Sequence, residues 1–189
     1  MKTVSFSHIF ASSGIVLLVA FSASLLSGLP GDLGAYDLGT AALGAFYGCV
    51  LFVLMMALSR YLIRYSESFR DLTWMLSQLF GQFTWRMIIL VSIMAGVSEE
   101  LLFRGVIQNW LMSFTSPWVA IVLSSLLFAL MHFYNRLYFL ITFIVSLMIA
   151  YLYLVTNSLL LVMVLHAVYD FFAFVSIVKY PRFFGLYCK

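Results

Sequence analysis

Six long apolar runs, separated by short polar segments, make up most of the chain. A run of about 20 apolar residues is long enough to cross the hydrocarbon core of a bilayer as a helix. None of the runs alternates as barrel strands do, so helices are the spanning structure that fits them. The runs are Ile9–Leu29, Thr40–Ser59, Met87–Met112, Pro117–Tyr134, Leu137–Thr156 and Ser158–Val178. The sequence therefore predicts an all-α, polytopic bundle of about six transmembrane helices.

The composition places this bundle in a lipid bilayer. Hydrophobic residues make up 65% of the chain and charged residues 9%, whereas about a quarter of an average soluble domain is charged. The net charge of +3 is spread out, and without a basic run we expect no nucleic-acid partner. Cys49 and Cys188 form no CxxC pair, so we expect no thiolate metal site or redox site. Nothing in the sequence indicates an oligomeric state.

Basic residues occur in every second loop, and this alternation predicts the orientation. They are Lys2 before the first run, Arg60, Arg64, Arg70 and Arg86 in the second loop, Arg136 in the fourth, and Lys179, Arg182 and Lys189 in the tail. The positive-inside rule then puts both termini in the cytoplasm. The short loops favour a prokaryotic cell (inner) membrane. The run Ile9–Leu29 resembles a signal peptide, but it is long enough to span, so we expect it to be retained.

We expect one integral membrane domain over residues 1–189, in three parts. Residues 1–65 form an N-terminal helix pair, residues 66–86 an interfacial helix and loop, and residues 87–179 the core helices that hold the site. Within the middle part, apolar residues recur at three- and four-residue steps from Phe69 to Phe83, the pattern of an amphipathic helix. Such a helix lies on the membrane surface, or packs against the bundle as a loop helix. A mobile gate over a site is a further possibility.

Few ionisable residues interrupt the apolar runs. They are Glu99, Glu100, Arg104 and Asp170, joined by the histidines His132 and His166. Insertion of an Arg or Asp at a helix centre costs about 2.5–3.5 kcal/mol. These groups must therefore face one another or a water-filled cavity. Ionisable residues in this setting indicate a functional site by default.

The spacing of these residues predicts which of them meet. Glu100 and Arg104 are four apart on one helix and can pair, while Glu99 is turned about 100° away. His166 and Asp170 are also four apart, so Asp170 can accept a hydrogen bond that fixes the tautomer of His166.

Depth in the membrane gives a second expectation. Counted from the turn near Phe114–Ser116 at about 1.5 Å per residue, Glu99 and His132 lie close to one level. Counted from the turn near Asn157, His166 is shallower by about 10 Å unless the last helix is tilted or displaced.

Three short motifs carry these residues, and together they resemble one family. The string Glu99-Glu100-Leu101-Leu102-Phe103-Arg104 resembles the EExxxR motif of the CPBP family, the CAAX-protease and bacteriocin-processing (ABI) proteins. The string Phe128-Ala129-Leu130-Met131-His132 resembles its FxxxH motif. The string His166-Ala167-Val168-Tyr169-Asp170 resembles its Hxxx(N/D) motif. All three occur in order within roughly Trp85–Val178, each on a predicted membrane helix.

The resemblance implies a glutamate-type intramembrane endopeptidase that requires no metal. By analogy with the family, Glu99 and His132 activate the attacking water, His166 and Asp170 stabilise the oxyanion, and Glu100 and Arg104 support the site or contact substrate. The substrate implied is a membrane-associated protein or peptide: a prenylated tail, a leader peptide or a C-terminal sorting helix. Prenyl proteases usually carry Asn at the position of Asp170. Because an ionised Asp cannot donate a hydrogen bond, Asp170 either orients His166 or is protonated.

Four other interpretations of the same residues stay open. The cluster can be a purely structural set of polar contacts between helices. Glu99, His132 and His166 match a two-His, one-carboxylate zinc site, although the sequence has no HExxH motif. Some family members are catalytically silent scaffolds or regulators that bind a partner membrane protein. A proton-coupled transporter also buries such groups, but no inverted repeat is visible.

Overall fold

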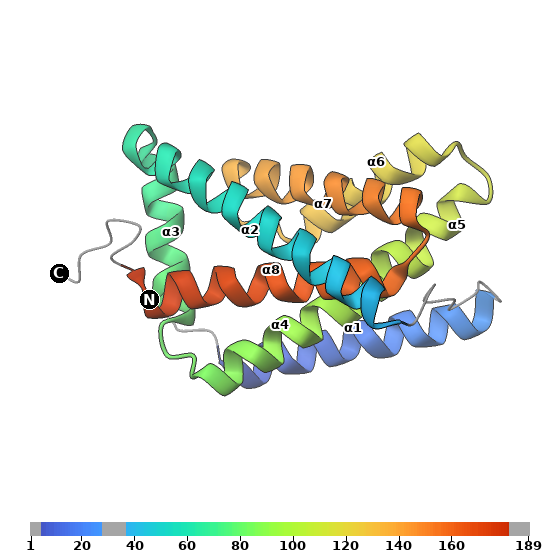
Figure 1. The fold of residues 1–189 in the computed structure, drawn as a ribbon, viewed down its shortest axis with the longest axis horizontal. Helices are drawn as coiled ribbons and strands as arrows, with labels where there is room; N and C mark the ends of the chain where they lie inside the picture. Colours follow the sequence, from blue (N-terminus) through green and yellow to red (C-terminus); the bar gives the residue numbers. More distant parts are fainter. Residues whose placement is uncertain (1–4, 28–36, 182–189) are drawn as a thin grey trace.

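The chain folds as a bundle of helices in a computed structural model that describes residues 5–27 and 37–181 (Figure 1). The elements are α1 (Phe6–Ser27), α2 (Leu38–Tyr65), α3 (Glu67–Phe80), α4 (Trp85–Glu100), the π-helix η1 (Leu101–Gln108), α5 (Asn109–Met112), α6 (Pro117–Met131), α7 (Arg136–Thr156) and α8 (Leu159–Lys179). The predicted all-α, polytopic fold class is confirmed. The residues Lys2, Arg182, Cys188 and Lys189, and Leu29 at the end of the first predicted run, lie outside the described ranges.

Four of the helices are individually long and apolar enough to cross a membrane, namely α1, α2, α7 and α8. The predicted run Met87–Met112 corresponds to α4, η1 and α5, which follow one another without a loop. The run Pro117–Tyr134 corresponds to α6, which is apolar but shorter. Each predicted run therefore has a helical counterpart, and the expected number of about six spans stays a prediction.

Polar caps explain where most of these helices begin. An Asp, Ser, Thr or Asn precedes each of six helices, and its side-chain oxygen accepts a hydrogen bond from a backbone N–H of the first turn. These caps are Asp37, Ser66, Thr84, Ser116, Asn135 and Ser158. The hydrogen bonds from Thr40 lower the pKa of Asp37. Between α7 and α8, Asn157 adopts a left-handed conformation with φ of 47°, which Asn tolerates better than most residues.

Helix α8 runs through the middle of the bundle and packs against α2, α4, α3, α7 and η1 (Figure 1). Glycines allow α2 and α4 to approach it closely. A Cβ at Gly48 of α2 would lie 2.6 Å from the Leu165 carbonyl oxygen, and a Cβ at Gly96 of α4 would lie 2.7 Å from that of Met163. Small residues let helix backbones approach in this way, which is a main source of helix association in membranes.

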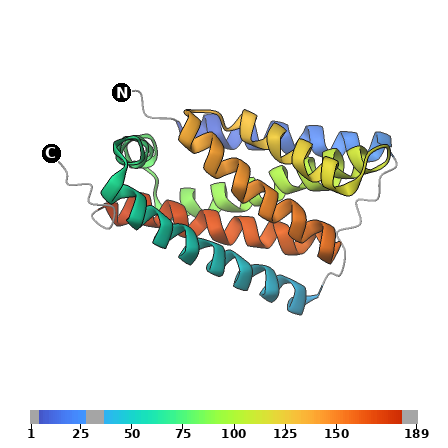
Figure 2. The same cartoon turned by 90° about the horizontal axis from the view of Figure 1, so that it is seen from above.

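The remaining helices surround this centre. Helix α1 packs against α4 and η1, whereas α2 packs against α8, so the two N-terminal helices lie on different sides of the bundle (Figure 2). Helix α6 packs against α7 and η1. The two helices of the N-terminal part are therefore adjacent in sequence, but α1 packs against α4 and η1 and α2 packs against α8.

Helix α3 crosses one end of the bundle at a steep angle to its neighbours (Figure 1). Its apolar face buries Phe69, Leu72 and Met75 against α2, α7 and α8, while Trp74 is exposed. This is the loop-helix arrangement expected as one of two alternatives. The helix ends at Phe80 and not at Phe83 as the periodicity indicated, because residues 81–84 form a turn whose Phe83 carbonyl accepts a hydrogen bond from Lys179 Nζ at 2.7 Å.

We predict that Gly48→Ala lowers the thermal stability of the protein, because the added methyl group overlaps the backbone of α8. Overpacking of this kind costs about 1–3 kcal/mol. Gly14→Ala is the matched control, since nothing lies within 4 Å of a Cβ there. Thermal unfolding of both purified variants in the same detergent measures the difference, and equal midpoints would contradict the glycine contact.

Candidate active site

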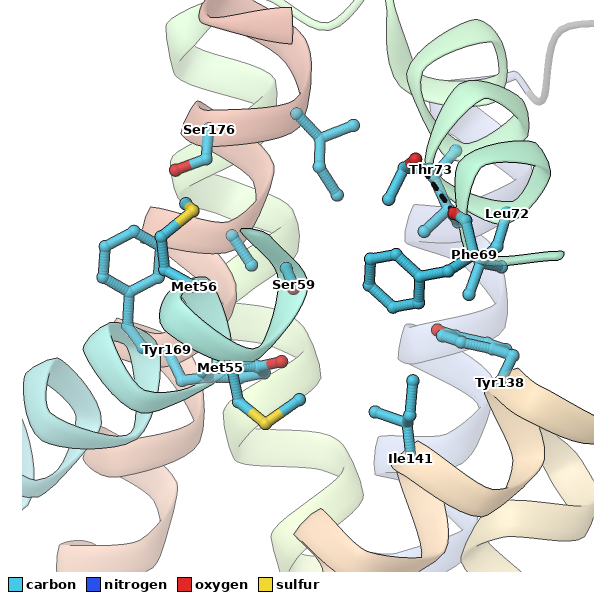
Figure 3. A pocket seen from close by; sticks show the side chains of 14 residues that line it. Met55, Met56, Ser59, Phe69, Leu72, Thr73, Tyr138, Ile141, Tyr169 and Ser176 are labelled. Carbon is cyan, nitrogen blue, oxygen red and sulfur yellow. Dashed lines mark hydrogen bonds between the residues drawn. The ribbon is translucent and has the colours of Figure 1, made fainter. Parts of the chain in front are cut away.

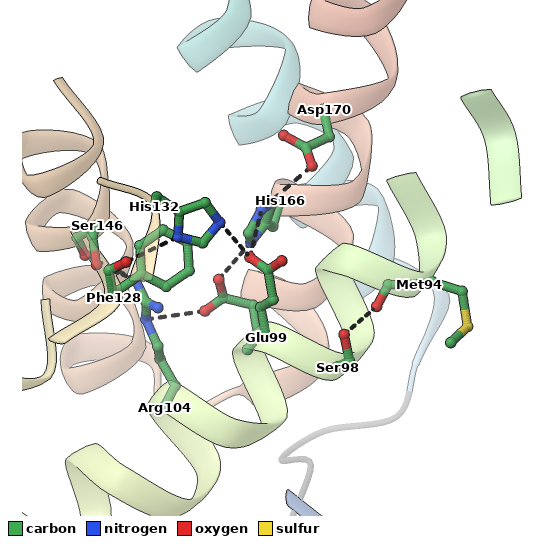
Figure 4. Close-up of polar contacts among 10 residues, drawn as sticks. Met94, Ser98, Glu99, Arg104, Phe128, His132, Ser146, His166 and Asp170 are labelled. Atoms are coloured by element: carbon green, nitrogen blue, oxygen red, sulfur yellow. Dashed lines mark hydrogen bonds and ion pairs between the residues drawn. The ribbon is translucent and has the colours of Figure 1, made fainter. Parts of the chain in front are cut away.

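The six ionisable residues singled out from the sequence come together at the junction of α4 and η1, the end of α6 and the middle of α8 (Figure 4). The contacts that join them are Glu100–Arg104, Glu100–His166, Glu99–His132, Glu99–His166 and Asp170–His166. The expectation that these groups face one another is therefore met in the structure. Their individual roles stay predictions.

The pair of Glu100 and Arg104 is the most deeply buried part of the cluster. Arg104 Nε lies 3.0 Å from Glu100 Oε2, and both side chains are almost fully inaccessible. Arg104 Nη2 also donates to the carbonyl oxygen of Ser146 at 2.9 Å and to its Oγ at 3.0 Å. The guanidinium lies 5.2 Å from the centre of the Phe128 ring. The predicted pair is thus present, and it also ties η1 to α7.

His166 faces Asp170, as the spacing predicts, but its direct hydrogen bond is to Glu100, which the spacing did not predict. His166 Nδ1 lies 2.6 Å from Glu100 Oε1, a direct hydrogen bond. Its Nε2 lies 3.6 Å from Asp170 Oδ2, beyond the usual range of a direct bond. The reason is packing, because Gly96, one turn before Glu100, brings α4 so close to α8 that the imidazole reaches across.

His132 has a defined tautomer because of its contact with Phe128. Its Nδ1 lies 2.9 Å from the Phe128 carbonyl oxygen. A carbonyl can only accept, so Nδ1 must carry the proton, and in the neutral ring Nε2 is then an acceptor. The two rings stack with centroids 4.4 Å apart. The four-residue spacing of the FxxxH motif thus fixes both the position and the tautomer of His132.

Glu99 faces two imidazole nitrogens without touching either. Its Oε2 lies 3.7 Å from His132 Nε2 and 3.9 Å from His166 Nε2. Both distances exceed a direct hydrogen bond, so Glu99 is not bonded directly to either ring. The side chain of Glu99 is 20% exposed, whereas that of Glu100 is 0% exposed. Of the two neighbouring glutamates, only Glu99 is therefore accessible to water and substrate.

His166 and Glu99 lie at one level because the last helix is displaced, which was the alternative left open by the count of residues. Counting from the turns assumed that the turn before α8 is level with the turn before α6. Leu159, the first residue of α8, instead lies against Gly105 in the middle of η1, where a Cβ would be 3.2 Å from Leu159 Cδ2. Helix α8 therefore begins deeper in the bundle, and His166 reaches the level of Glu99.

Some supporting residues were missed by reasoning from the sequence. The π-helix η1 begins directly after Glu100, and such segments occur frequently at functional sites. Two further polar contacts reach α7. Gln108 Nε2, at the end of η1, donates to the Ala150 carbonyl oxygen at 3.1 Å, and Asn109 Nδ2, at the start of α5, donates to the Tyr153 hydroxyl at 2.8 Å. Gln108 and Asn109 were visible as polar residues in an apolar run, whereas Ser146 gave no signal.

Within residues 5–27 and 37–181, no group of three His, Cys, Asp or Glu side chains is arranged to hold a metal ion. The zinc alternative at Glu99, His132 and His166 stays a question for metal analysis of the purified protein.

Comparison with known families supports the resemblance seen in the motifs. Residues 81–172 match the family model described as Rce1-like, type II CAAX prenyl endopeptidase. The matched segment runs from the turn before α4 into α8 and contains all six candidate residues. The resemblance to the CAAX-protease family is therefore confirmed. No curated protein and no solved structure was found to match the chain.

We predict that Glu100→Gln destabilises the protein far more than Glu99→Gln does. Removing one partner of a buried ion pair leaves the other charge uncompensated and costs about 3–5 kcal/mol, whereas Glu99 makes no direct hydrogen bond that its amide would lose. Thermal unfolding in detergent compares the two variants. The double variant Glu100→Gln/Arg104→Met should recover part of the loss, and equal midpoints for the two single variants would contradict the structural role of Glu100.

Proposed function

Because residues 81–172 belong to the Rce1-like family of type II CAAX prenyl endopeptidases, we propose that the chain is an intramembrane endopeptidase in which Glu99 and His132 activate water. The family implies a peptide hydrolase, and the long apolar helices make the chain an integral membrane protein. The observation that supports the glutamate mechanism is the 3.7 Å separation of Glu99 Oε2 from the acceptor nitrogen of His132.

In this mechanism a water molecule lies between Glu99 and His132 and loses a proton to one of them. General bases in such positions contribute about 10²–10⁴-fold to the rate. The water oxygen bonds to the scissile carbonyl carbon, and the carbonyl π electrons move to its oxygen. When the C–N bond then breaks, the proton held by the base passes to the leaving amine.

His166 and Asp170 provide for the negative charge that develops on the carbonyl oxygen. The cluster contains three carboxylates and one guanidinium. A protonated His166 therefore brings the net charge of the cluster closer to zero. With Nδ1–H bound to Glu100, the Nε2–H of that imidazolium is the donor for the oxyanion, and such preorganised donors are a large part of catalysis. Asp170, 3.6 Å away, acts as the charge partner of His166 and not as a donor.

The substrate is a membrane-associated protein or peptide, with a prenylated tail, a leader peptide and a C-terminal sorting helix as the candidates. We place the protein in a prokaryotic cell membrane with both termini in the cytoplasm, as the alternation of basic loops indicates. No metal is required in this scheme. The competing function is a catalytically silent scaffold that binds a partner membrane protein.

We predict that Glu99→Gln removes proteolysis while leaving the fold intact, because the amide cannot accept the proton of the water. Mass spectrometry of membrane-protein N- and C-termini compares cells that carry wild type, Glu99→Gln or the control Glu67→Gln, at matched protein levels. Glu67 is an exposed glutamate on α3, far from the cluster in sequence. New termini present with wild type and Glu67→Gln but reduced at least about 10²-fold with Glu99→Gln support the proposal.

The same comparison of protein termini distinguishes the protease from the catalytically silent scaffold. If the termini are identical in all three samples and the Glu99→Gln cells keep the wild-type phenotype, the protease proposal is wrong and the scaffold function is favoured.

A further inference from the structure

Several buried hydroxyls of this bundle are hydrogen-bonded within their own helix. Thr73 of α3, Ser98 of α4 and Ser124 of α6 each donate to a carbonyl oxygen three or four residues earlier. Figure 3 shows this bond for Thr73, beside the apolar cavity that it lines, and Figure 4 shows it for Ser98. A hydroxyl satisfied in this way needs no further ligand, so buried polar groups without such a partner are the ones that indicate a bound molecule.

Three polar side chains lack a protein partner where η1 meets α6 and α7. Among the described residues, Arg104 Nη1, Gln108 Oε1 and Ser125 Oγ are buried atoms that make no hydrogen bond within the protein. Each of these side chains is at most 1% exposed, so bulk solvent does not reach it. Buried polar groups are almost always hydrogen-bonded, either to the protein or to an ordered water. The three atoms therefore require a partner from outside the chain.

The contacts of Arg104 and Gln108 bring two of these atoms near each other. Both side chains reach from η1 to α7, where Arg104 Nη2 donates to Ser146 and Gln108 Nε2 donates to the Ala150 carbonyl oxygen. Ser146 and Ala150 are one turn apart, which is about 6 Å along a helix. Two hydrogen bonds of about 2.9 Å, one on each side of a single water, span nearly this distance.

Ser125 approaches the same place from α6. It lies three residues before Phe128 and therefore on the same face of the helix. The Phe128 ring lies 5.2 Å from the guanidinium of Arg104, beside which Figure 4 shows it, and its centroid lies 4.9 Å from that of Phe103 in η1. The face of α6 that carries Ser125 is thus the face that packs against η1.

The donors and acceptors at this place restrict the chemistry of the ligand. Arg104 directs Nε toward Glu100 and Nη2 toward Ser146, so Nη1 is the group that offers donors. Gln108 Oε1 can only accept, and the Ser125 hydroxyl can do both. An anion is disfavoured because the amide oxygen and the nearby Glu100 carboxylate repel it, and a cation is disfavoured by the guanidinium. A small neutral molecule that both accepts and donates is the ligand that fits.

We infer that one water molecule is bound between Arg104, Gln108 and Ser125 as a permanent part of the fold. It accepts a hydrogen bond from Nη1–H, donates one to Gln108 Oε1 and has the Ser125 hydroxyl as its third partner. Three partners are typical of a buried water. The site is separate from the water that is hydrolytically activated in the proposed function. It completes the hydrogen bonding of a buried guanidinium and joins η1 to α6, the helix that ends at His132.

We predict that Ser125→Ala lowers the thermal unfolding midpoint of the purified protein in detergent by about 2–4 °C, the shift for loss of about one hydrogen bond in a chain of this length. Ser124→Ala is the matched control, because this neighbouring serine is equally buried but bonds to the Ile121 carbonyl oxygen of its own helix. Its midpoint should stay near that of wild type. A Ser125→Ala midpoint equal to or above that of Ser124→Ala would overturn the inference, since removal of a hydroxyl without any ligand is not destabilising.

A double-variant comparison tests whether Gln108 and Ser125 bind the same water. Ser125→Ala is measured in wild type and in Gln108→Met, whose side chain has a similar length and lacks the amide. If the water is shared, Gln108→Met has already weakened it, and Ser125→Ala should then have little further effect, because the two changes are coupled. Ser124→Ala should have the same effect in both backgrounds. An undiminished effect of Ser125→Ala in Gln108→Met would overturn the shared site.

An experimental structure of the wild-type protein, at a resolution that shows ordered water, tests the site without any variant. A water peak within about 3.2 Å of Arg104 Nη1, Gln108 Oε1 and Ser125 Oγ supports the inference. A direct hydrogen bond between the guanidinium and the amide oxygen would overturn it. Ordered water elsewhere inside the bundle together with no peak at this place would overturn it as well.

Discussion

The buried carboxylate of Glu100 is the interaction on which the rest of the site depends. One of its oxygens is 2.6 Å from His166 on α8, and the other is 3.0 Å from Arg104, which in turn binds Ser146 on α7. Through these contacts one side chain joins α4, η1, α7 and α8. Because neither charge of such a pair tolerates loss of its partner, the geometry of the site is coupled to the stability of the bundle.

This arrangement requires α8 to lie unusually close to its neighbours. The glycines at 48 and 96 permit this approach on the two sides of α8. A bulkier residue at position 96 would move α4 outward, and the hydrogen bond between Glu100 and His166 would lengthen with it. Backbone contact through small residues, which is common between membrane helices, therefore determines the reach of the ionisable side chains.

Much of this architecture follows from the sequence, and the parts that do not have identifiable physical causes. The length of the apolar runs predicted the helices, and the cost of burying charge predicted that Glu99, Glu100 and His166 would meet. The contact of His166 with Glu100 was missed, because a four-residue spacing reports only contacts within one helix, whereas this contact depends on how closely two helices pack. The depth of His166 was left open between two alternatives, because turn positions in different loops share no common level.

Glu99 and Glu100 show how a difference of one position separates structure from chemistry. Turned by about 100° on the same helix, the two side chains differ. Glu100 is fully buried, with one oxygen hydrogen-bonded to His166 and the other in an ion pair with Arg104. Glu99 is partly exposed and faces two imidazoles beyond direct hydrogen-bonding distance. The carboxylate of Glu100 is inaccessible, so no water reaches it to give up a proton. The carboxylate of Glu99 is accessible and lies beside a histidine of fixed tautomer, so it can take a proton from water. The two adjacent glutamates of the motif therefore have different parts: Glu100 holds the helices together, and Glu99 is free to react.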